Sequence, residues 1–357
     1  IFFYSVILVY LNKMYLAPFL NWQKLYNKKI LISGAYGMIA SYMVYMLAYL
    51  NRYKQGGIEI YALGRNPKKF EEKFKELIQQ PWFHVVHQDV NEPLQNLPKV
   101  DYIIHAASPA SPHFYGSKPV DVILPNVLDT NNLLRKAVED KVEGFLFVSS
   151  GPYGNLEGQV DSIRETDIGP LDPLKVGSCY SESKRCGETL CICYYHQYGT
   201  PINCVRPSHT YGPTMDLNDS RVFANFVHDA VNGQNIEIKG DGTASRSFCY
   251  ISDAVLAYYK VLLDAPRGEA YNVGNDETDI TVADLAELIV RLCPEKNLHV
   301  VYRQREKADT YITSPIVKAP ILNTEKIRSL GWRWKISLED GFSRTLRSFS
   351  EDLQIRE

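Results

Sequence analysis

Short apolar runs alternate with amphipathic stretches along the first 206 residues of the chain. Runs of this length are typical of strands that are buried on both faces. Helical periodicity marks residues 42–50, 121–139 and 178–195. Strands that alternate with helices predict an α/β protein with a doubly wound parallel sheet of the Rossmann type. The predicted strands are Lys29–Ser33, Ile58–Leu63, Phe83–His87, Val100–His105 and Phe145–Ser150.

The pattern changes near Pro207, where turn-forming residues become frequent. Helical stretches at 222–231, 251–263 and 282–292 surround one short strand at 236–238. We therefore expect a dinucleotide-binding domain at 28–206 and a smaller α/β substrate-binding lobe at 207–350, with the chain crossing back to the main sheet. The active site is expected in the cleft between lobe and sheet. Residues 1–27 are treated as an N-terminal extension.

Residues 1–11 are almost wholly apolar, and Asn12 and Lys13 interrupt the run. A helix needs about 20 such residues to cross a bilayer, so no membrane span is expected. The run also lacks a basic start and a clean cleavage site, which argues against a signal peptide. Met14 is a candidate start, and a peripheral membrane contact is the minor alternative.

Composition narrows the classes of partner. A net charge of −2 gives no reason to expect binding to nucleic acid or to an anionic membrane. The seven cysteines show no metal-ligand spacing, which favours reduced thiols in a cytoplasmic protein. No metal site is expected.

A glycine turn follows the first strand. Gly34, Gly37 and Ala40 have the spacing G-x-x-G-x-x-A, and a helical pattern begins directly afterwards. Gly34 would form the tight turn, Gly37 would let phosphates approach the backbone, and Ala40 would let helix and strand pack closely. Free N–H groups and the dipole at a helix start suit a pyrophosphate. The turn therefore predicts a dinucleotide cofactor, with a simple tight turn as the alternative.

The ends of the second and third strands bear on which nicotinamide cofactor is bound. An acid after the second strand would accept hydrogen bonds from the ribose 2′-hydroxyl, whereas an arginine favours the 2′-phosphate of NADP. The chain has Gly64-Arg65-Asn66, which taken alone favours NADP, with a solvated Arg65 as the alternative. Asp89, after the third strand, either accepts from the adenine amino group or only shapes a turn.

A tyrosine and a lysine four residues apart carry the candidate chemistry. Tyr180 and Lys184 share one helix face, and an ammonium beside a phenol lowers the pKa of the phenol. A phenolate can take a proton from an alcohol while hydride leaves the same carbon for nicotinamide. A serine must orient that alcohol. We favour Ser150 over Ser149, because the register of a strand is harder to shift than the length of a loop.

Together these motifs resemble the extended short-chain dehydrogenase/reductase family, in its branch of nucleotide-sugar epimerases, dehydratases and decarboxylases. The resemblance covers roughly residues 28–349. UDP-glucuronate decarboxylases are resembled in particular, and dTDP-glucose 4,6-dehydratases come next. The motifs are HAASPASP at 105–112, CYSESKR at 179–185, NDSRVFANF at 218–226 and RSFCYISD at 246–253.

The resemblance implies a redox-neutral cycle with a retained NAD. Tyr180 would deprotonate the 4-hydroxyl of the sugar, and hydride from C4 would reduce the cofactor. The 4-keto form of a glucuronate is a β-keto acid and would lose carbon dioxide, after which hydride return to C4 would give a pentose nucleotide. A substrate with a hydroxyl at C6 would instead allow dehydration.

The resemblance also assigns residues to sites. Arg246 matches an arginine that faces the diphosphate or the sugar acid, because a planar cationic fork suits either anion; a surface arginine is the alternative. His209 replaces an asparagine common in the family, and either donates to substrate or is structural. The catalytic residues are Tyr180, Lys184 and Ser150. The cofactor-binding residues are Gly34, Gly37, Met38, Ile39, Arg65, Asp89, Val90, Ala106, Ala107, Ser108, Asn126, Tyr180, Lys184 and Pro207. The substrate-binding residues are Ser108, Pro109, His209, Arg221, Asn225 and Arg246.

Two positions depart from the family pattern. Relatives place a glutamate or an Asp-Glu pair before Val-Tyr-Gly, whereas this chain has SSGPYG at 149–154, which lacks the acid and looks one residue shorter. Loss of that carboxylate bears on both decarboxylation and dehydration. The second departure is Gly64-Arg65, where relatives that retain NAD usually have an aspartate.

We therefore expect a cytoplasmic enzyme of the UDP-glucuronate decarboxylase type, making sugar precursors for surface polysaccharide from a nucleotide-diphosphate sugar. The alternatives are a 4,6-dehydratase, a 4-epimerase, an NADPH-consuming 4-keto reductase and, from another class, a non-catalytic nucleotide-sugar or dinucleotide sensor. The resemblance also implies a homodimer formed by the helices near 121–139 and 179–198.

Overall fold

The central sheet is parallel throughout, and its strand order is β12-β7-β5-β4-β1-β2-β3. The computed structural model describes residues 2–89, 91–151, 153–304 and 320–353. From β1 the chain moves outward to β2 and β3, returns to β4 on the other side of β1, and continues outward again. The prediction of a doubly wound sheet is confirmed. The strands are β1 (Lys29–Ser33), β2 (Glu59–Gly64), β3 (Phe83–His87), β4 (Tyr102–His105), β5 (Gly144–Val148), β7 (Ile202–Pro207) and β12 (Glu269–Val273).

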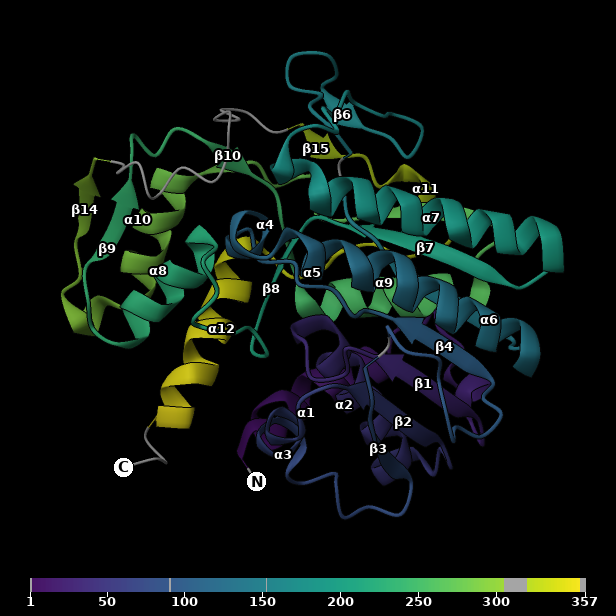
Figure 1. Cartoon of the computed structure of the whole chain (residues 1–357). Helices are drawn as coiled ribbons and strands as arrows, with labels where there is room; N and C mark the ends of the chain where they lie inside the picture. The colour runs from purple at the N-terminus through teal and green to yellow at the C-terminus, as the bar shows by residue number, and fades with distance from the viewer. Residues whose placement is uncertain (1, 90, 152, 305–319, 354–357) are drawn as a thin grey trace.

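Helices cover both faces of the sheet (Figure 1). One face carries α2 (Met38–Lys54), α3 (Pro67–Phe74) and α9 (Ile251–Asp264), with α1 (Phe2–Tyr15) packed on α2 and α9. The other face carries α5 (Pro119–Leu124), α6 (Thr130–Asp140) and α7 (Cys179–Tyr198). Because α1 and α9 cover its outer side, α2 is buried continuously from Ala40 to Leu50.

The crossover between β4 and β5 is interrupted, although its sequence predicts one helix over 121–139. A π-type turn, Pro125–Asp129, separates α5 from α6. Proline has no N–H to complete the helical ladder, and such insertions often occur at functional sites. The turn buries Asn126 and Asp129, which are 0% and 3% exposed.

Two strands of the central sheet, β7 and β12, were not predicted from the sequence, because polar residues interrupt their apolar pattern. Asn203 in β7 donates to the carbonyl of Val261 in α9 (3.1 Å), and Arg206 is paired with Glu188 of α7 at 2.7 Å. The chain therefore crosses back through α9 and β12 to the edge of the main sheet.

Three helices and short strand pairs pack together beside the main sheet in the region predicted as the smaller lobe (Figure 1). Helices α8 (Val222–Val231) and α10 (Val282–Leu292) pack with α12 (Leu338–Leu353). Tyr211 stacks on Phe342 of α12, with ring centroids 4.1 Å apart. The strand pairs are β9 (Ile236–Lys239) with β14 (Val300–Arg303), β10 (Ser245–Arg246) with β13 (Ile280–Thr281), and β8 (His209–Tyr211) with β11 (Phe248–Tyr250).

The remaining described elements are short. A parallel pair, β6 with β15, brings Leu322 next to Ile163 in a small apolar cluster. Within the described residues, no helix is both long and apolar enough to cross a membrane. The short elements are η1 (Trp22–Leu25), α4 (His113–Ser117), β6 (Ser162–Ile163), η3 (Val176–Ser178), η4 (Pro294–Lys296), β15 (Ile321–Leu322) and α11 (Glu325–Arg328).

Candidate active site

The glycine turn lies at the switch point between β1 and β4, where open α/β sheets bind ligands. Gly34 has a φ of +64°, and a Cβ there would lie 2.7 Å from the Cα of Ala107. The Gly37 N–H donates to the Gly34 carbonyl (2.8 Å), and α2 begins at Met38. The turn therefore packs against the backbone after β4 and leaves the first N–H groups of α2 without helical partners.

Buried polar atoms without partners point to a ligand at this edge of the sheet. Among the described residues, Ser108 Oγ, Asn126 Oδ1 and Ser208 Oγ are buried and accept or donate no hydrogen bond. Such atoms are costly unless a bound molecule pairs with them. Together with the close approach at Gly34, they fit a dinucleotide whose pyrophosphate lies over the turn.

A buried hydrogen-bond chain joins the glycine turn to the crossover, and the sequence analysis missed it. Ser33 and His105 face each other in the register of β1 and β4, with Ser33 Oγ 2.7 Å from His105 Nδ1. Thr130 donates to the Asn126 carbonyl (2.7 Å), so its oxygen is left to accept from His105 Nε2 at 3.0 Å. Ser33 Oγ accepts from the N–H groups of Ala106 and Ala107 at 3.3 Å and donates to Nδ1.

The hydrogen bonds from Ser33 through His105 to Thr130 require a neutral His105 that carries its proton on Nε2. Complete burial, followed by the charge of Lys184, lowers the pKa of His105 to about 3. The network therefore fixes the backbone of Ala106 and Ala107, just after β4, relative to Asn126 in the crossover.

Residues predicted for the adenosine end bind each other. Arg65 Nη1 lies 3.5 Å from Asp89 Oδ2. Asp89 Oδ1 accepts from the backbone and side-chain N–H groups of Asn91, both at 3.0 Å. Asp89 therefore shapes its own turn and partly neutralises Arg65. Val90 lies outside the described residues.

The candidate catalytic residues come together on α7 and at the end of β5. Ser150 lies next to the phenol of Tyr180 and acts to lower the pKa of that phenol. Ser149 is 3% exposed and instead shares a hydrogen bond with the hydroxyl of Tyr153. Of the two serines, Ser150 is the one that lies beside Tyr180.

The structure contradicts the expectation that Lys184 makes Tyr180 acidic. Burial raises the pKa of Tyr180 above its usual value, and the opposing effects come from Ser150 and Arg221. Lys184 Nζ donates to the Val148 carbonyl at 2.7 Å. Burial lowers the pKa of Lys184 to about 7, because a charged ammonium loses its hydration there. A partly neutral lysine that is bonded elsewhere does little to ionise the phenol.

Three residues predicted to bind substrate, Arg221, Arg246 and His209, lie on or next to α8, β10 and β8. Arg221 holds Asp219 through its Nε and Nη2 atoms, the shortest distance being 2.8 Å. Arg246 Nη1 donates to the Ser245 carbonyl (2.6 Å). The surrounding protein, and then the charges of Arg246 and Arg221, lower the pKa of His209 to about 4. The imidazole is nevertheless exposed, so the two positive charges are the firmer reason why the neutral form of His209 is favoured at pH 7.

The other predicted positions surround this group. Ser111, just after Pro109, hydrogen-bonds Ser220 at 2.9 Å, which joins the loop after β4 to the loop before α8. Asn225 donates weakly to the Ser220 carbonyl (3.5 Å) and is exposed. Pro207 ends β7 beside Val273.

Two neighbours of the catalytic group were not predicted. Tyr115 of α4 stacks on Tyr180, with centroids 5.2 Å apart and planes 14° apart. At Gly151, where the family resemblance predicts an acid that this chain lacks, a Cβ would lie 3.2 Å from Leu322 Cδ2. An apolar side chain therefore adjoins this position. The stacking of Tyr115 on Tyr180 cannot be predicted from the sequence, whereas the missing acid can be seen there.

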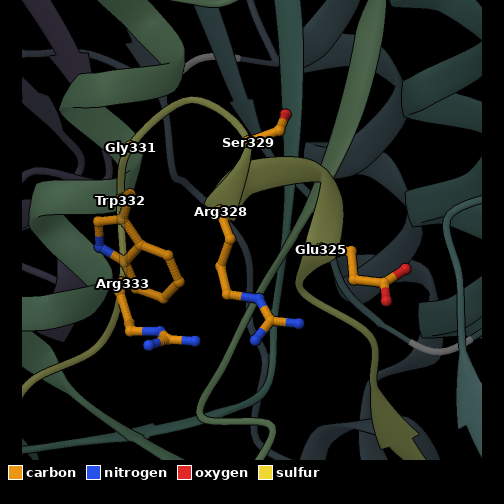
Figure 2. A pocket seen from close by; sticks show the side chains of 6 residues that line it. All are labelled: Glu325, Arg328, Ser329, Gly331, Trp332 and Arg333. Atoms are coloured by element: carbon orange, nitrogen blue, oxygen red, sulfur yellow. The ribbon is translucent and has the colours of Figure 1, made fainter.

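A separate hollow of about 430 Å³ lies around α11. Figure 2 shows Arg328 and Arg333 extending to one side of it and Glu325 on another. Arg328 is paired with Asp276 (3.4 Å), and Trp332 Nε1 donates to the Asp253 carbonyl (3.0 Å). These residues hold the C-terminal segment in place, and none of them belongs to the predicted catalytic, cofactor-binding or substrate-binding sets. Among the described residues, no cluster of three or more histidine, cysteine or acidic side chains could hold a metal.

Comparisons with known proteins identify relatives of this chain. A family model described as "NAD dependent epimerase/dehydratase family" matches residues 30–274. UDP-glucuronic acid decarboxylase 3 of Arabidopsis thaliana is 34% identical over 331 residues, which cover 92% of this chain and 90% of the relative. UDP-glucuronic acid decarboxylase 1 of Danio rerio is 31% identical over 329 residues, covering 92% and 74%.

Solved structures share the fold. UDP-glucose 4-epimerase from Thermotoga maritima, crystallised with UDP-glucose, superposes with a TM-score of 0.77 at 24% identity, covering 91% of this chain and 99% of its own. dTDP-glucose 4,6-dehydratase from Bacillus anthracis, in complex with NAD, gives 0.75 at 22% identity, covering 92% and 98%.

Proposed function

Because the chain belongs to the NAD-dependent epimerase/dehydratase family, we propose that it is a nucleotide-sugar enzyme of the UDP-glucuronate decarboxylase type. It would work through a 4-keto sugar and a retained NAD. The observation that carries the proposal is the position of Ser150 next to the Tyr180 phenol, whose pKa it acts to lower, in a chain whose glycine turn at Gly34 fits a dinucleotide. A protein that only binds a dinucleotide needs no such pair.

The residues of the chain divide the work as follows. Ser150 orients the 4-hydroxyl, and Tyr180 accepts its proton once the phenol is ionised. Lys184 stabilises that phenolate when substrate and cofactor complete the site, because it is within one helical turn and retains a proton about half the time near pH 7. NAD, when bound, supplies the acceptor and later the donor of the hydride at C4.

The missing acid at Gly151 bears on both reactions, and dehydration depends on such an acid more than decarboxylation does. When a 4-keto uronate loses carbon dioxide, the electrons of the C5–C6 bond pass to the ketone oxygen, which Tyr180 and Ser150 hold by hydrogen bonds. The departing carbon dioxide needs no proton, and C5 then takes one from water. Loss of hydroxide from C6 would need a proton donor, and Leu322 is what adjoins Gly151.

The basic group of the smaller lobe suits an acidic, diphosphate-bearing substrate. Arg221 and Arg246 carry permanent charge, and a guanidinium binds carboxylate or phosphate through two parallel hydrogen bonds. Arg221 already binds the carboxylate of Asp219 in this manner, with Nε donating to Oδ1 and Nη2 donating to Oδ2. Neutral His209 between them can donate one further hydrogen bond.

NAD fits better than NADP in this proposal. Arg65, the residue that favoured NADP, lies beside Asp89, whose carboxylate would repel a 2′-phosphate. The family to which the chain belongs is described as NAD dependent.

We place the enzyme in the cytoplasm as a homodimer that makes precursors for surface polysaccharide. Apolar side chains stand exposed on the crossover: Val120 at 61%, Ile123 at 37% and Leu128 at 42%. They lie on helices that the family resemblance assigns to a dimer interface. A second copy of the chain would cover them, and sedimentation velocity tests this directly.

The first experiment is mass spectrometry of small molecules that copurify, followed by turnover of UDP-glucuronate. Bound NAD and release of carbon dioxide with a UDP-pentose product support the proposal. A 4-keto-6-deoxy product from dTDP-glucose would instead indicate a dehydratase, and consumption of added NADPH would indicate a reductase. Tight binding without turnover of any sugar would indicate a sensor.

Matched tyrosine variants separate chemistry from folding. Tyr180→Phe removes the proposed base and should lower kcat by about 10²-fold or more while bound NAD is retained. Tyr194→Phe, on the same helix, removes a hydroxyl that bonds Asn131 at 2.9 Å and should leave kcat unchanged. Equal losses in both variants would contradict the assignment.

A further inference from the structure

The adenosine end of the predicted cofactor site lacks its usual acid. β2 ends at Gly64-Arg65, and Asp89 after β3 is engaged by Arg65 and Asn91. A ribose or adenine bound there would still present N–H and O–H donors that need an acceptor. Another carboxyl group in this region could supply that acceptor.

Asp129 provides such a group. It is 3% exposed, and its Oδ1 is buried with no hydrogen-bond partner among the described residues. A buried acceptor left unpaired costs stability, and in a native protein it calls for an explanation. Burial, followed by the charge of Asp89, raises the pKa of Asp129 to about 8, so the carboxyl is mostly protonated in the empty protein at pH 7.

Neighbouring hydrogen bonds fix where Asp129 lies. Thr130, the next residue, bonds His105 at the end of β4 (3.0 Å). Asn132 donates to the carbonyls of Asn91 and Glu92, in the loop after β3, at 3.3 and 3.2 Å. The segment that carries Asp129 therefore reaches from the end of β4 to the loop after β3.

The strand order places that segment beside the adenosine half of a bound dinucleotide. In the sheet, β1 and β2 lie between β4 and β3. The glycine turn after β1 and Arg65 after β2 therefore both lie between the end of β4 and the end of β3. A pyrophosphate over the turn would send its adenosine toward β2 and β3. The charges that act on the Asp129 carboxyl come from Asp89 and Arg65 on this side and from Lys184 on the other.

We infer that Asp129 binds the adenosine half of the cofactor, accepting an N–H of adenine or an O–H of the ribose on its unpaired Oδ1. The inference rests on the proposed function for the identity of the dinucleotide. Asp129 replaces the acid missing after β2, and it acts in cofactor recognition, apart from the reacting atoms.

The test uses the full chain and three probes: NAD, ADP and UDP. Asp129→Leu removes the acceptor and keeps a similar volume. One lost hydrogen bond should weaken NAD and ADP by about 5- to 20-fold in isothermal titration calorimetry, while UDP binds as before. Glu139→Leu, an exposed carboxyl on α6, is the matched control and should leave all three affinities unchanged.

Thermal unfolding of the empty proteins separates recognition from structure. Removal of an unpaired buried carboxyl should leave the Tm of Asp129→Leu equal to that of the wild type or higher. Unchanged affinity for ADP would overturn the inference, as would a lowered Tm or an equal loss of UDP binding. Asp129→Ala is the second variant, with the same expected outcomes, for use if leucine prevents folding.

Failure of the proposed function gives a different result. A wild-type protein that binds ADP but converts no UDP-sugar refutes the proposed reaction, and the inference about Asp129 stands or falls on the variant. IDP, which lacks the adenine amino group, identifies the donor. If the amino group is the donor, IDP binds the wild type about as weakly as ADP binds Asp129→Leu.

Discussion

Lys184 should destabilise the empty protein, and its removal should make the fold more stable while abolishing turnover. The side chain is 2% exposed, and its Nζ donates to the Val148 carbonyl at 2.7 Å. Burial lowers its pKa from 10.5 to about 7. At about 1.4 kcal/mol for each tenfold change in proton affinity, this burial costs on the order of 4 kcal/mol at pH 7. Lys184→Met keeps the volume and removes the charge.

The variant also loses the hydrogen bond to Val148, which is worth about 1 to 2 kcal/mol. The net expectation is a gain in unfolding free energy of about 2 to 3 kcal/mol at pH 7. The pH dependence follows from the lowered pKa. The penalty of Lys184 is fully present below pH 7 and disappears as the pH rises from 7 to 10.5, where the unfolded chain also loses its proton.

Urea unfolding of the empty proteins at pH 7 and pH 10 measures both quantities. Lys136→Met is the contrasting variant, since Lys136 is paired with Asp140 at 2.8 Å and its removal should destabilise the fold. The reasoning is refuted if Lys184→Met is less stable than the wild type at pH 7, or if the difference between them stays constant up to pH 10.

Three further predictions follow from the site. Ser150→Ala should lower kcat by about 10²-fold with little change in Tm, whereas Ser149→Ala should lower Tm and largely spare kcat, because its hydroxyl bonds Tyr153 in the interior; the opposite pattern in kinetics and melting would assign the role to Ser149. Gly34→Ala should lose copurifying NAD, because the backbone there has φ +64° and a Cβ would lie 2.7 Å from the backbone of the opposite loop; NAD content by absorbance after denaturation tests this, and full occupancy would contradict it. Burial lowers the pKa of His105 to about 3, so the free energy of unfolding should fall as the pH drops from 6.5 toward 3, because the unfolded chain then takes up a proton that the buried imidazole does not. His105→Asn should show a flatter dependence of unfolding free energy over that window, and parallel curves would count against it.

The parts of the fold that follow local rules could be predicted from the sequence. The first five strands have apolar runs of the right length, and the glycine turn has a fixed spacing. Strand β7 was not predicted, because Asn203 and Arg206 interrupt its apolar pattern. Their partners, Val261 and Glu188, come from other parts of the chain. A one-dimensional pattern cannot show that a polar residue is paired in the interior.

The candidate site divides in the same way. The spacing of Tyr180 and Lys184 is local, so their common helix face was predictable. Their pKa values depend on burial and on the Val148 carbonyl, and these come from tertiary packing. The prediction that the phenol is acidic was wrong for this reason. The choice between Ser149 and Ser150 likewise depends on Tyr153, four residues along the loop.

The central claim is that Tyr180 and a retained NAD oxidise C4 of the sugar and later reduce it again. UDP-glucuronate that carries deuterium at C4 tests this most directly, with analysis of the product by mass spectrometry and NMR. The account predicts a UDP-pentose that keeps the deuterium at C4, formed together with one carbon dioxide and without added reductant. Loss of the deuterium to solvent, or a requirement for stoichiometric NADH or NADPH, would contradict it.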